Sequence, residues 1–190
     1  MSLDTLVFDI ETQNFFTDPG VGWNTFDALK LSVVGIYSYD KDAYECFEVS
    51  EIARAAEFFR NAVRLVGFSI NRYDVPVLTR NFLKLESREG LDLWKKERVD
   101  LLEEVEMASG GRVSLEKLAQ ANLGLGKTRH SAEAVALWKN GEIEELKAYC
   151  LQDVRLTKEL YDLLKRQGYL LVPKRGSEEL EKVMIGSRLL

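Results

Sequence analysis

The sequence predicts a single α/β domain in which an antiparallel meander and parallel strands form one mixed sheet flanked by helices. Short β-branched and aromatic runs come first in the chain, helical periodicity follows, and strands then alternate with helices. With 190 residues, of which 46% are hydrophobic and 30% charged, the chain has the size and composition of one domain with a sizeable core.

The expected strands are apolar runs bounded by polar segments. The first run leads into Asp9-Ile10-Glu11, as a buried strand does when its last residues reach a polar site. The second and third strands are joined by the short polar link at 40–42, which predicts an antiparallel pair. The predicted strands are centred on residues 6–8, 31–39, 43–49, 65–69 and 98–102.

The expected helices show apolar residues at helical spacing, with Ser114 and Ser131 as candidate N-caps and Gly168 as the end signal of the last one. The predicted helices cover 52–66, a stretch that ends at 85, 115–122, 132–139 and a long helix from 142 to Gly168. Residues 1–168 therefore form the expected domain. The tail at 169–190 is expected to hold a strand-like tether at 169–173 and a helix at 178–185, or to be a linker to a further domain such as a helicase or polymerase.

Composition excludes several classes of protein. A formal net charge of −5 argues against a protein that coats nucleic acid with a large basic field, although carboxylates gathered around cations would add to the negative count. No signal-peptide pattern or spanning apolar run is apparent, so we expect no membrane partner and a cytoplasmic location. Cys46 and Cys150 lack the spacing of a metal or disulfide site and are expected to be small buried side chains.

Asp9 and Glu11 stand two residues apart at the end of a predicted strand. Period-two alternation points both carboxylates to one face, where they repel each other unless a cation lies between them. By itself this pattern is weak, because such a pair is more often a solvated strand edge. The wholly apolar run before it favours the metal interpretation.

Two further segments add acidic residues at helix positions. Asp74 follows a predicted buried strand where a helix begins, so it is either a ligand facing the site, an N-cap with Pro76 in the first turn, or both. Tyr149 and Asp153 lie four residues apart on the long helix, and therefore on one face at the edge of its apolar stripe. A carboxylate at that edge is costly without a cation.

In this order, the segments resemble the three motifs of the DEDDy 3′–5′ exonucleases of the ribonuclease H-like superfamily. The matching segments are Phe8-Asp9-Ile10-Glu11-Thr12, Gly67 to Leu78, and Tyr149-Cys150-Leu151-Gln152-Asp153. The chain looks most similar to predicted exonucleases that resemble the proofreading domain of family B DNA polymerases. It has Ala148 where the sibling DEDDh group places histidine, and Ser69 where its relatives usually carry asparagine.

The resemblance implies hydrolysis of phosphodiester bonds at the free 3′ end of a single-stranded DNA or RNA, with release of nucleoside 5′-monophosphates. It implies two divalent cations, Mg²⁺ or Mn²⁺, bridged by Asp9, with Glu11 and Asp153 completing the first site and Asp74 holding the second mainly through water. Tyr149 would orient the attacking water. The expected substrate contacts are Ile10, Thr12, Phe68, Asn71, Arg72, Lys127, Arg129 and His130.

Two other functions stay open at this point. One is a catalytically silent nucleic-acid-binding or scaffold domain of the same fold, against which the full ligand set argues. The other is an endonuclease of the superfamily, which has no reason to keep Tyr149 four residues before Asp153. The residues do not distinguish DNA from RNA.

Overall fold

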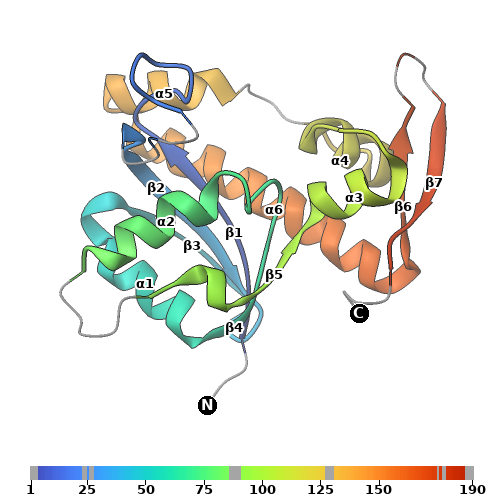
Figure 1. The fold of residues 1–190 in the computed structure, drawn as a ribbon, viewed down its shortest axis with the longest axis horizontal. Coiled ribbons are helices and arrows are strands. Elements are labelled where there is room, and N and C mark those ends of the chain that lie inside the picture. Colours follow the sequence, from blue (N-terminus) through green and yellow to red (C-terminus); the bar gives the residue numbers. More distant parts are fainter. Residues whose placement is uncertain are drawn as a thin grey trace.

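The computed structural model describes residues 4–22, 25, 28–85, 91–126, 131–174, 176 and 179–186. A five-stranded sheet with strand order β3-β2-β1-β4-β5 is the centre of this part of the chain (Figure 1). Its strands are β1 (Asp4–Thr12), β2 (Leu31–Ser38), β3 (Ala43–Glu48), β4 (Ala62–Gly67) and β5 (Glu97–Asp100). The first three strands form an antiparallel meander, whereas β4 and β5 run parallel to β1. The predicted mixed sheet is confirmed.

Helices cover both faces of the sheet (Figure 1). On one face, Phe8 of β1 packs edge-on against Phe59, whose ring also contacts Phe82, so that α1 and α2 are fastened to the sheet by aromatic contacts. On the other face, α6 crosses β2 and β1. The helices and 3₁₀ turns are η2 (Val49–Glu51), α1 (Ile52–Asn61), α2 (Asp74–Leu83), η3 (Leu93–Lys95), α3 (Leu101–Ser109), α4 (Leu115–Leu123), α5 (Ser131–Asn140) and α6 (Ile143–Gln167).

Alternation along β1 separates its apolar and acidic side chains. Phe8 and Ile10 are buried in the core beneath α1 and α2, whereas Val7 belongs to the core on the α6 side. Because successive side chains of a strand point to opposite faces, Asp9 and Glu11 face α6. The central strand therefore delivers both carboxylates to one side of the sheet.

The expected helix at 52–66 is too long, and the strand expected at 65–69 begins earlier. The helix α1 ends at Asn61, and Ala62 adopts an extended conformation from which β4 pairs in parallel with β1. The small and branched apolar residues at 62–66 fit either period. Pairing with β1 decides between them, and it leaves Val63 exposed.

Two further predictions from the sequence were wrong, one in the end of a strand and one in the type of an element. The strand expected at 98–102 ends at Asp100, because this carboxylate caps α3. Within the helix expected at 178–185, residues 180–184 form a strand instead, since β6 (Tyr169–Pro173) and β7 (Leu180–Met184) form an antiparallel hairpin. The Ser114 cap and the left-handed Gly168 at the end of α6 are confirmed.

Within the residues described, no helix has both the length and the apolar character needed to cross a lipid bilayer. The domain limit at residue 168 stays a prediction.

Candidate active site

Three carboxylates meet where β1 ends beside α6. Asp9 and Glu11 from β1 and Asp153 from α6 each offer one oxygen, and these three oxygens lie within 4.8 Å of one another. Asp153 is buried, whereas Asp9 and Glu11 are half-buried. Like charges this close are unfavourable without a cation. The structure therefore brings three of the four predicted acidic residues into one cluster.

A close approach between α6 and the sheet makes this cluster possible. Gly35 of β2 pairs with Asp9, and a Cβ atom at Gly35 would lie 2.8 Å from the Cys150 sulfur and 3.1 Å from Val154 Cγ2. Because Gly35 has no side chain, α6 can pack closely against β2 at the residue that pairs with Asp9. The Cys150 thiol fills the space, with its Sγ 3.5 Å from the Asp9 carbonyl oxygen. Sequence reasoning singled out neither Gly35 nor this role for Cys150.

Tyr149 stands one turn before Asp153 on α6, and both side chains line the same cleft. Burial raises the pKa of the Tyr149 phenol, and the negative charges of Asp153 and Glu11 raise it further. The phenol therefore stays protonated near neutral pH. It can donate a hydrogen bond there, but it cannot act as a base.

The loop between β4 and α2 forms the second half of the site. Gly67 begins it where no side chain fits, because a Cβ atom would lie 2.1 Å from Ile70 Cγ2 and 3.0 Å from the Phe8 carbonyl oxygen. Ser69 adopts a left-handed conformation with φ of 66°. A non-glycine residue in this region carries conformational strain, so other contacts must hold the loop.

Asp100 is the residue that holds this loop, and sequence reasoning missed it. Its buried carboxylate accepts the backbone N–H groups of Ser69 at 2.8 Å and Asn71 at 2.9 Å, and also those of Leu102 and Glu103 at the start of α3. One side chain thus joins the loop to a helix N-terminus. The local signal was the spacing of Asp100 and Glu103, which is typical of a helix cap.

Asp74 is the first residue of α2, and its carboxylate turns toward β1 instead of capping the helix. The N-cap position belongs to Tyr73, and Asp74 Oδ1 accepts the backbone N–H of Ile10 at 3.1 Å. The N-cap interpretation is therefore wrong. Burial raises the pKa of Asp74 well above its ordinary value, and the nearby charge of Asp9 raises it further. Asp74 lies beside the three-carboxylate cluster without belonging to it.

A second bridge joins the loop to the end of β1. The hydroxyl groups of Thr12 and Tyr73 lie 2.9 Å apart, and Thr12 Oγ1 also donates to the Asn14 carbonyl oxygen at 2.8 Å. Because Thr12 has a single hydroxyl proton, Tyr73 is the donor between the two side chains. Burial raises the pKa of Tyr73 to about 12, so this donor persists across the physiological range.

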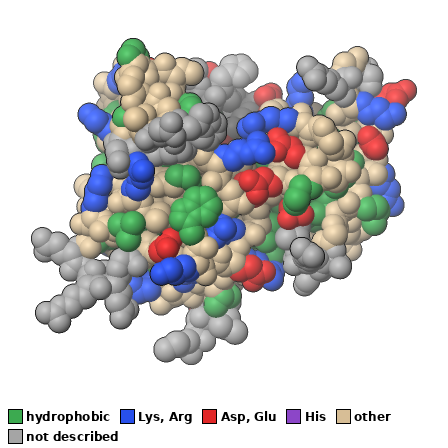
Figure 2. Space-filling view, viewed as in Figure 1, with side chains coloured by type: hydrophobic (Ala, Val, Ile, Leu, Met, Phe, Trp, Pro, Cys, Tyr) green, Lys and Arg blue, Asp and Glu red, His purple; other side chains and the backbone are tan. Residues whose placement is uncertain are grey.

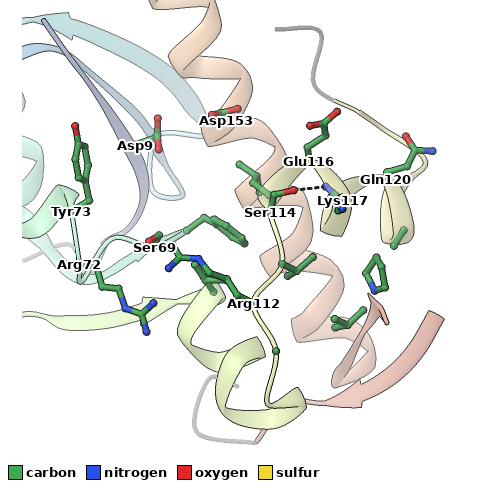
Figure 3. Close-up of a pocket in the computed structure, with 18 of the residues that line it drawn as sticks. Asp9, Ser69, Arg72, Tyr73, Arg112, Ser114, Glu116, Lys117, Gln120 and Asp153 are labelled. Carbon is green, nitrogen blue, oxygen red and sulfur yellow. Dashed lines mark hydrogen bonds between the residues drawn. The ribbon is translucent and has the colours of Figure 1, made fainter. Parts of the chain in front are cut away.

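These groups open into a cleft of about 2680 Å³ (Figure 3). Pockets for small molecules typically measure ~300–1,000 Å³, so this cleft suits a larger or extended ligand. Asp9 and Asp153 point into it from one side, and the residues around Ser114 and Lys117 form another wall. Basic and acidic side chains are interspersed on the described part of the face in Figure 2, so this part of the face carries no broad basic field.

The expected substrate contacts fall into three groups. Ile10, Thr12, Phe68 and Arg72 line the cleft, and Arg72 pairs with Glu106 at 2.6 Å. Asn71 does not line the cleft, because its side chain donates to Glu103 and accepts from Arg98. Lys127, Arg129 and His130 lie outside the described residues.

The donor set fits a hard divalent cation. The cluster offers only carboxylate oxygens, which are the ligands that Mg²⁺ and Mn²⁺ prefer. The buried and destabilised carboxylate of Asp74 beside Asp9 provides a further oxygen donor for which positive charge would be favourable.

Comparison with known proteins adds an independent observation. The model of the RNase H superfamily matches residues 6–165. Among solved structures, the chain is similar to the family B DNA polymerase from the hyperthermophilic archaeon Pyrobaculum calidifontis, with a TM-score of 0.62 and 18% sequence identity. The match covers 87% of this chain and 25% of the polymerase chain, and at this identity it shows a shared fold alone. No curated protein sequence matches the chain.

Proposed function

The chain belongs to the RNase H superfamily, and from this premise we propose that it is a metal-dependent 3′–5′ exonuclease of the DEDDy type. It would remove nucleoside 5′-monophosphates from the 3′ end of a single-stranded DNA or RNA. The observation that carries the proposal is the cluster of Asp9, Glu11 and Asp153 beside Tyr149, inside a cleft large enough for a polymer.

Divalent cations are the cofactors that the acidic groups would hold. Asp9, Glu11 and Asp153 would bind one Mg²⁺ or Mn²⁺, and Asp74 with Asp9 would hold a second. When bound, the two cations would neutralise charge on the reacting phosphate and lower the pKa of water. The four acidic residues would hold this positive charge on the side of the cleft that they line.

Tyr149 would position the attacking water by donating a hydrogen bond to it or to the scissile phosphate. Its raised pKa keeps the proton on the phenol, and its place one turn from Asp153 directs it to the cluster. Phe68, which lines the cleft, offers an aromatic face to the terminal base. Stacking on such a face tolerates every base, so little sequence preference is expected.

The proposal is tested with 5′-labelled single-stranded DNA and RNA in Mg²⁺, Mn²⁺ or EDTA, with the products resolved on a gel. A metal-dependent ladder that shortens from the 3′ end is expected. Asp9→Asn should lower the rate by at least ~100-fold, since the lost interaction stabilises the transition state by several kcal/mol. Glu57→Gln, which removes an exposed carboxylate on α1, is the matched control and should cleave normally.

Other outcomes would select the competing functions. Cleavage of circular single-stranded DNA would identify an endonuclease. Tight binding of the labelled strands without cleavage under any metal condition would indicate a silent binding domain. Wild-type cleavage by Asp9→Asn would overturn the assignment of the acidic cluster as the active site.

A further inference from the structure

The C-terminal hairpin lies beyond residues 6–165, the segment that the superfamily model matches, yet it is built into the body of the protein. Leu170, Val172, Val183 and Ile185 are buried in the same core as residues of α3, α4 and α6. Figure 1 shows β6 and β7 beside α4, near the end of α6. The hairpin is therefore a fixed wall and not a loose tether.

Asn122 of α4 holds the hairpin in place through two hydrogen bonds. Its side-chain amide donates to the carbonyl oxygen of Leu171 at 2.7 Å and accepts the backbone N–H of Leu171 at 2.8 Å. Such a two-point contact satisfies both backbone groups of a β6 residue. The Asn122 side chain thus supplies the backbone hydrogen bonds that a neighbouring strand would otherwise make with β6.

The hairpin borders the same cleft that holds the acidic cluster. Pro173, Lys174, Leu180 and Glu181 line it, at a distance along the chain from Asp9 and Asp153 but in one continuous cavity. Arg112 and Lys117 line the cleft as well, on the segment that joins α3 to α4 and on α4 itself (Figure 3). Among the described residues, and outside the four predicted metal ligands, the charged lining residues are Arg72, Arg112, Lys117, Lys174, Glu116 and Glu181.

Lys174 is suited to exchange its partner for a phosphate. Its ammonium group lies 2.9 Å from Glu179 across the hairpin, but the pair is half or more exposed. An exposed ion pair of this kind contributes little stability, so a phosphate group can replace the carboxylate at small cost. Pro173 and Leu180, which face each other across the strands, provide an apolar surface beside it.

We propose that the β6–β7 hairpin is part of the substrate-binding surface and holds the single strand upstream of the 3′ end, with Lys174 contacting a phosphate. This inference rests on the proposed function, which supplies the nucleic acid. The cleft is continuous and basic side chains line it, and both features favour a polynucleotide as the occupant. The hairpin thus makes the enzyme sensitive to the length of its substrate.

The binding experiment uses a labelled long oligothymidylate and a labelled trinucleotide, with fluorescence anisotropy measured in EDTA over a range of salt. Lys174→Ala should weaken binding of the long strand by about two- to five-fold. It should also reduce the slope of log K against log salt by ~0.7, the amount for one phosphate contact on a single strand. Glu181→Gln should have the opposite effect on affinity, since it removes a negative charge from the cleft.

Lys182→Ala is the matched control, because Lys182 is exposed on the same hairpin but stacks over the Tyr169 ring and does not line the cleft. It should bind both probes like the wild type. Equal binding by Lys174→Ala, Lys182→Ala and the wild type at every salt concentration would overturn the proposal, as would an equal loss with the trinucleotide.

Hydrolysis kinetics distinguish a failure of the hairpin proposal from a failure of the proposed exonuclease activity. Hydrolysis of the p-nitrophenyl ester of thymidine 5′-monophosphate reports the acidic cluster alone, so Lys182→Ala should leave it unchanged, whereas Lys174→Ala should raise KM for a long strand relative to Lys182→Ala. If the wild type cleaves neither substrate, the proposed exonuclease fails. The anisotropy measurements would still decide whether the hairpin binds nucleic acid.

Discussion

Asp9, Glu11 and Asp153 lie on regular secondary structure, whereas Asp74 follows an irregular loop at 68–73. The first three are placed by alternation along β1 and by the crossing of α6 over Gly35. The loop contains the left-handed Ser69 and depends on hydrogen bonds from residues distant in the chain. One half of the site is therefore set by local periods and the other by long-range hydrogen bonding.

The two halves meet at β1, where Ile10 donates its backbone N–H to Asp74 and Thr12 accepts from Tyr73. These contacts attach both halves of the site to the end of β1. Substitutions that disrupt the loop should therefore mainly reduce stability. Substitutions that disrupt the contact between α6 and the sheet should also change the spacing of the carboxylates.

Asp100→Ala breaks the loop half and should have the largest effect on stability. It leaves four backbone N–H groups without their acceptor and removes the cap of α3, so the free energy of unfolding should fall by about 3 kcal/mol. Urea denaturation measures it. Asp92→Ala is the control, because Asp92 caps a 3₁₀ turn through the Trp94 N–H and otherwise pairs with the exposed Lys95, so its loss should cost under ~1 kcal/mol. Equal losses in the two variants would contradict the role of Asp100.

Gly35→Ala tests the strand–helix half. The new methyl group would press on Cys150 and Val154, so the free energy of unfolding should fall by ~1–3 kcal/mol through overpacking. Nuclease activity should fall by about 10- to 100-fold, since misplacement of a catalytic group by ~1 Å costs on the order of 100-fold.

The double variant Gly35→Ala, Cys150→Ala should recover part of both losses, because it removes the atom nearest to the new methyl group. Gly186→Ala, where no atom lies within 4 Å of the added group, is the control. If the double variant is no better than Gly35→Ala, the close approach of α6 does not control the site.

Asp74→Asn tests the point where the two halves meet and should have the smallest effect on stability. Burial raises the pKa of Asp74 in the folded protein, so the wild type loses stability as the pH rises from the unfolded pKa toward the folded one, and this loss is complete above the folded pKa. In EDTA, the variant should therefore be more stable than the wild type at neutral pH, by about 1 kcal/mol. Its asparagine oxygen can still accept from Ile10.

The gain from Asp74→Asn should shrink as the pH falls toward the unfolded value of about 4, where the wild-type carboxyl group is protonated. Thermal unfolding at the two pH values measures the difference. A gain that does not depend on pH, or a loss at neutral pH, would show that charge burial at Asp74 is not its cause.

Much of the site was predictable because its signals are local. Spacing alone placed Asp9 with Glu11 on one face of a strand, and Tyr149 with Asp153 on one face of a helix. The meeting of these two pairs followed from resemblance, and the structure brings three of the carboxylates together. The engagement of Asn71 with Glu103 and Arg98 could not be foreseen, because both partners lie on other elements.

Two of the errors in the fold share one physical cause. At 62–66 and 178–185 the apolar residues are compatible with both the helical and the strand period, so the pattern does not decide. Pairing with β1 selects the strand in the first case, and pairing between β6 and β7 selects it in the second.

Composition and periods of a few residues were enough to predict the class of fold, the meander, the long helix α6, and the placement of Asp9 with Glu11 and of Tyr149 with Asp153 on one face of their elements. Only the tertiary structure decided how closely α6 approaches Gly35, which carboxylate holds the loop, and that the C-terminal hairpin lines the cleft. These depend on contacts between residues far apart in the chain, where packing and hydrogen-bond satisfaction choose among conformations that local propensity leaves equal.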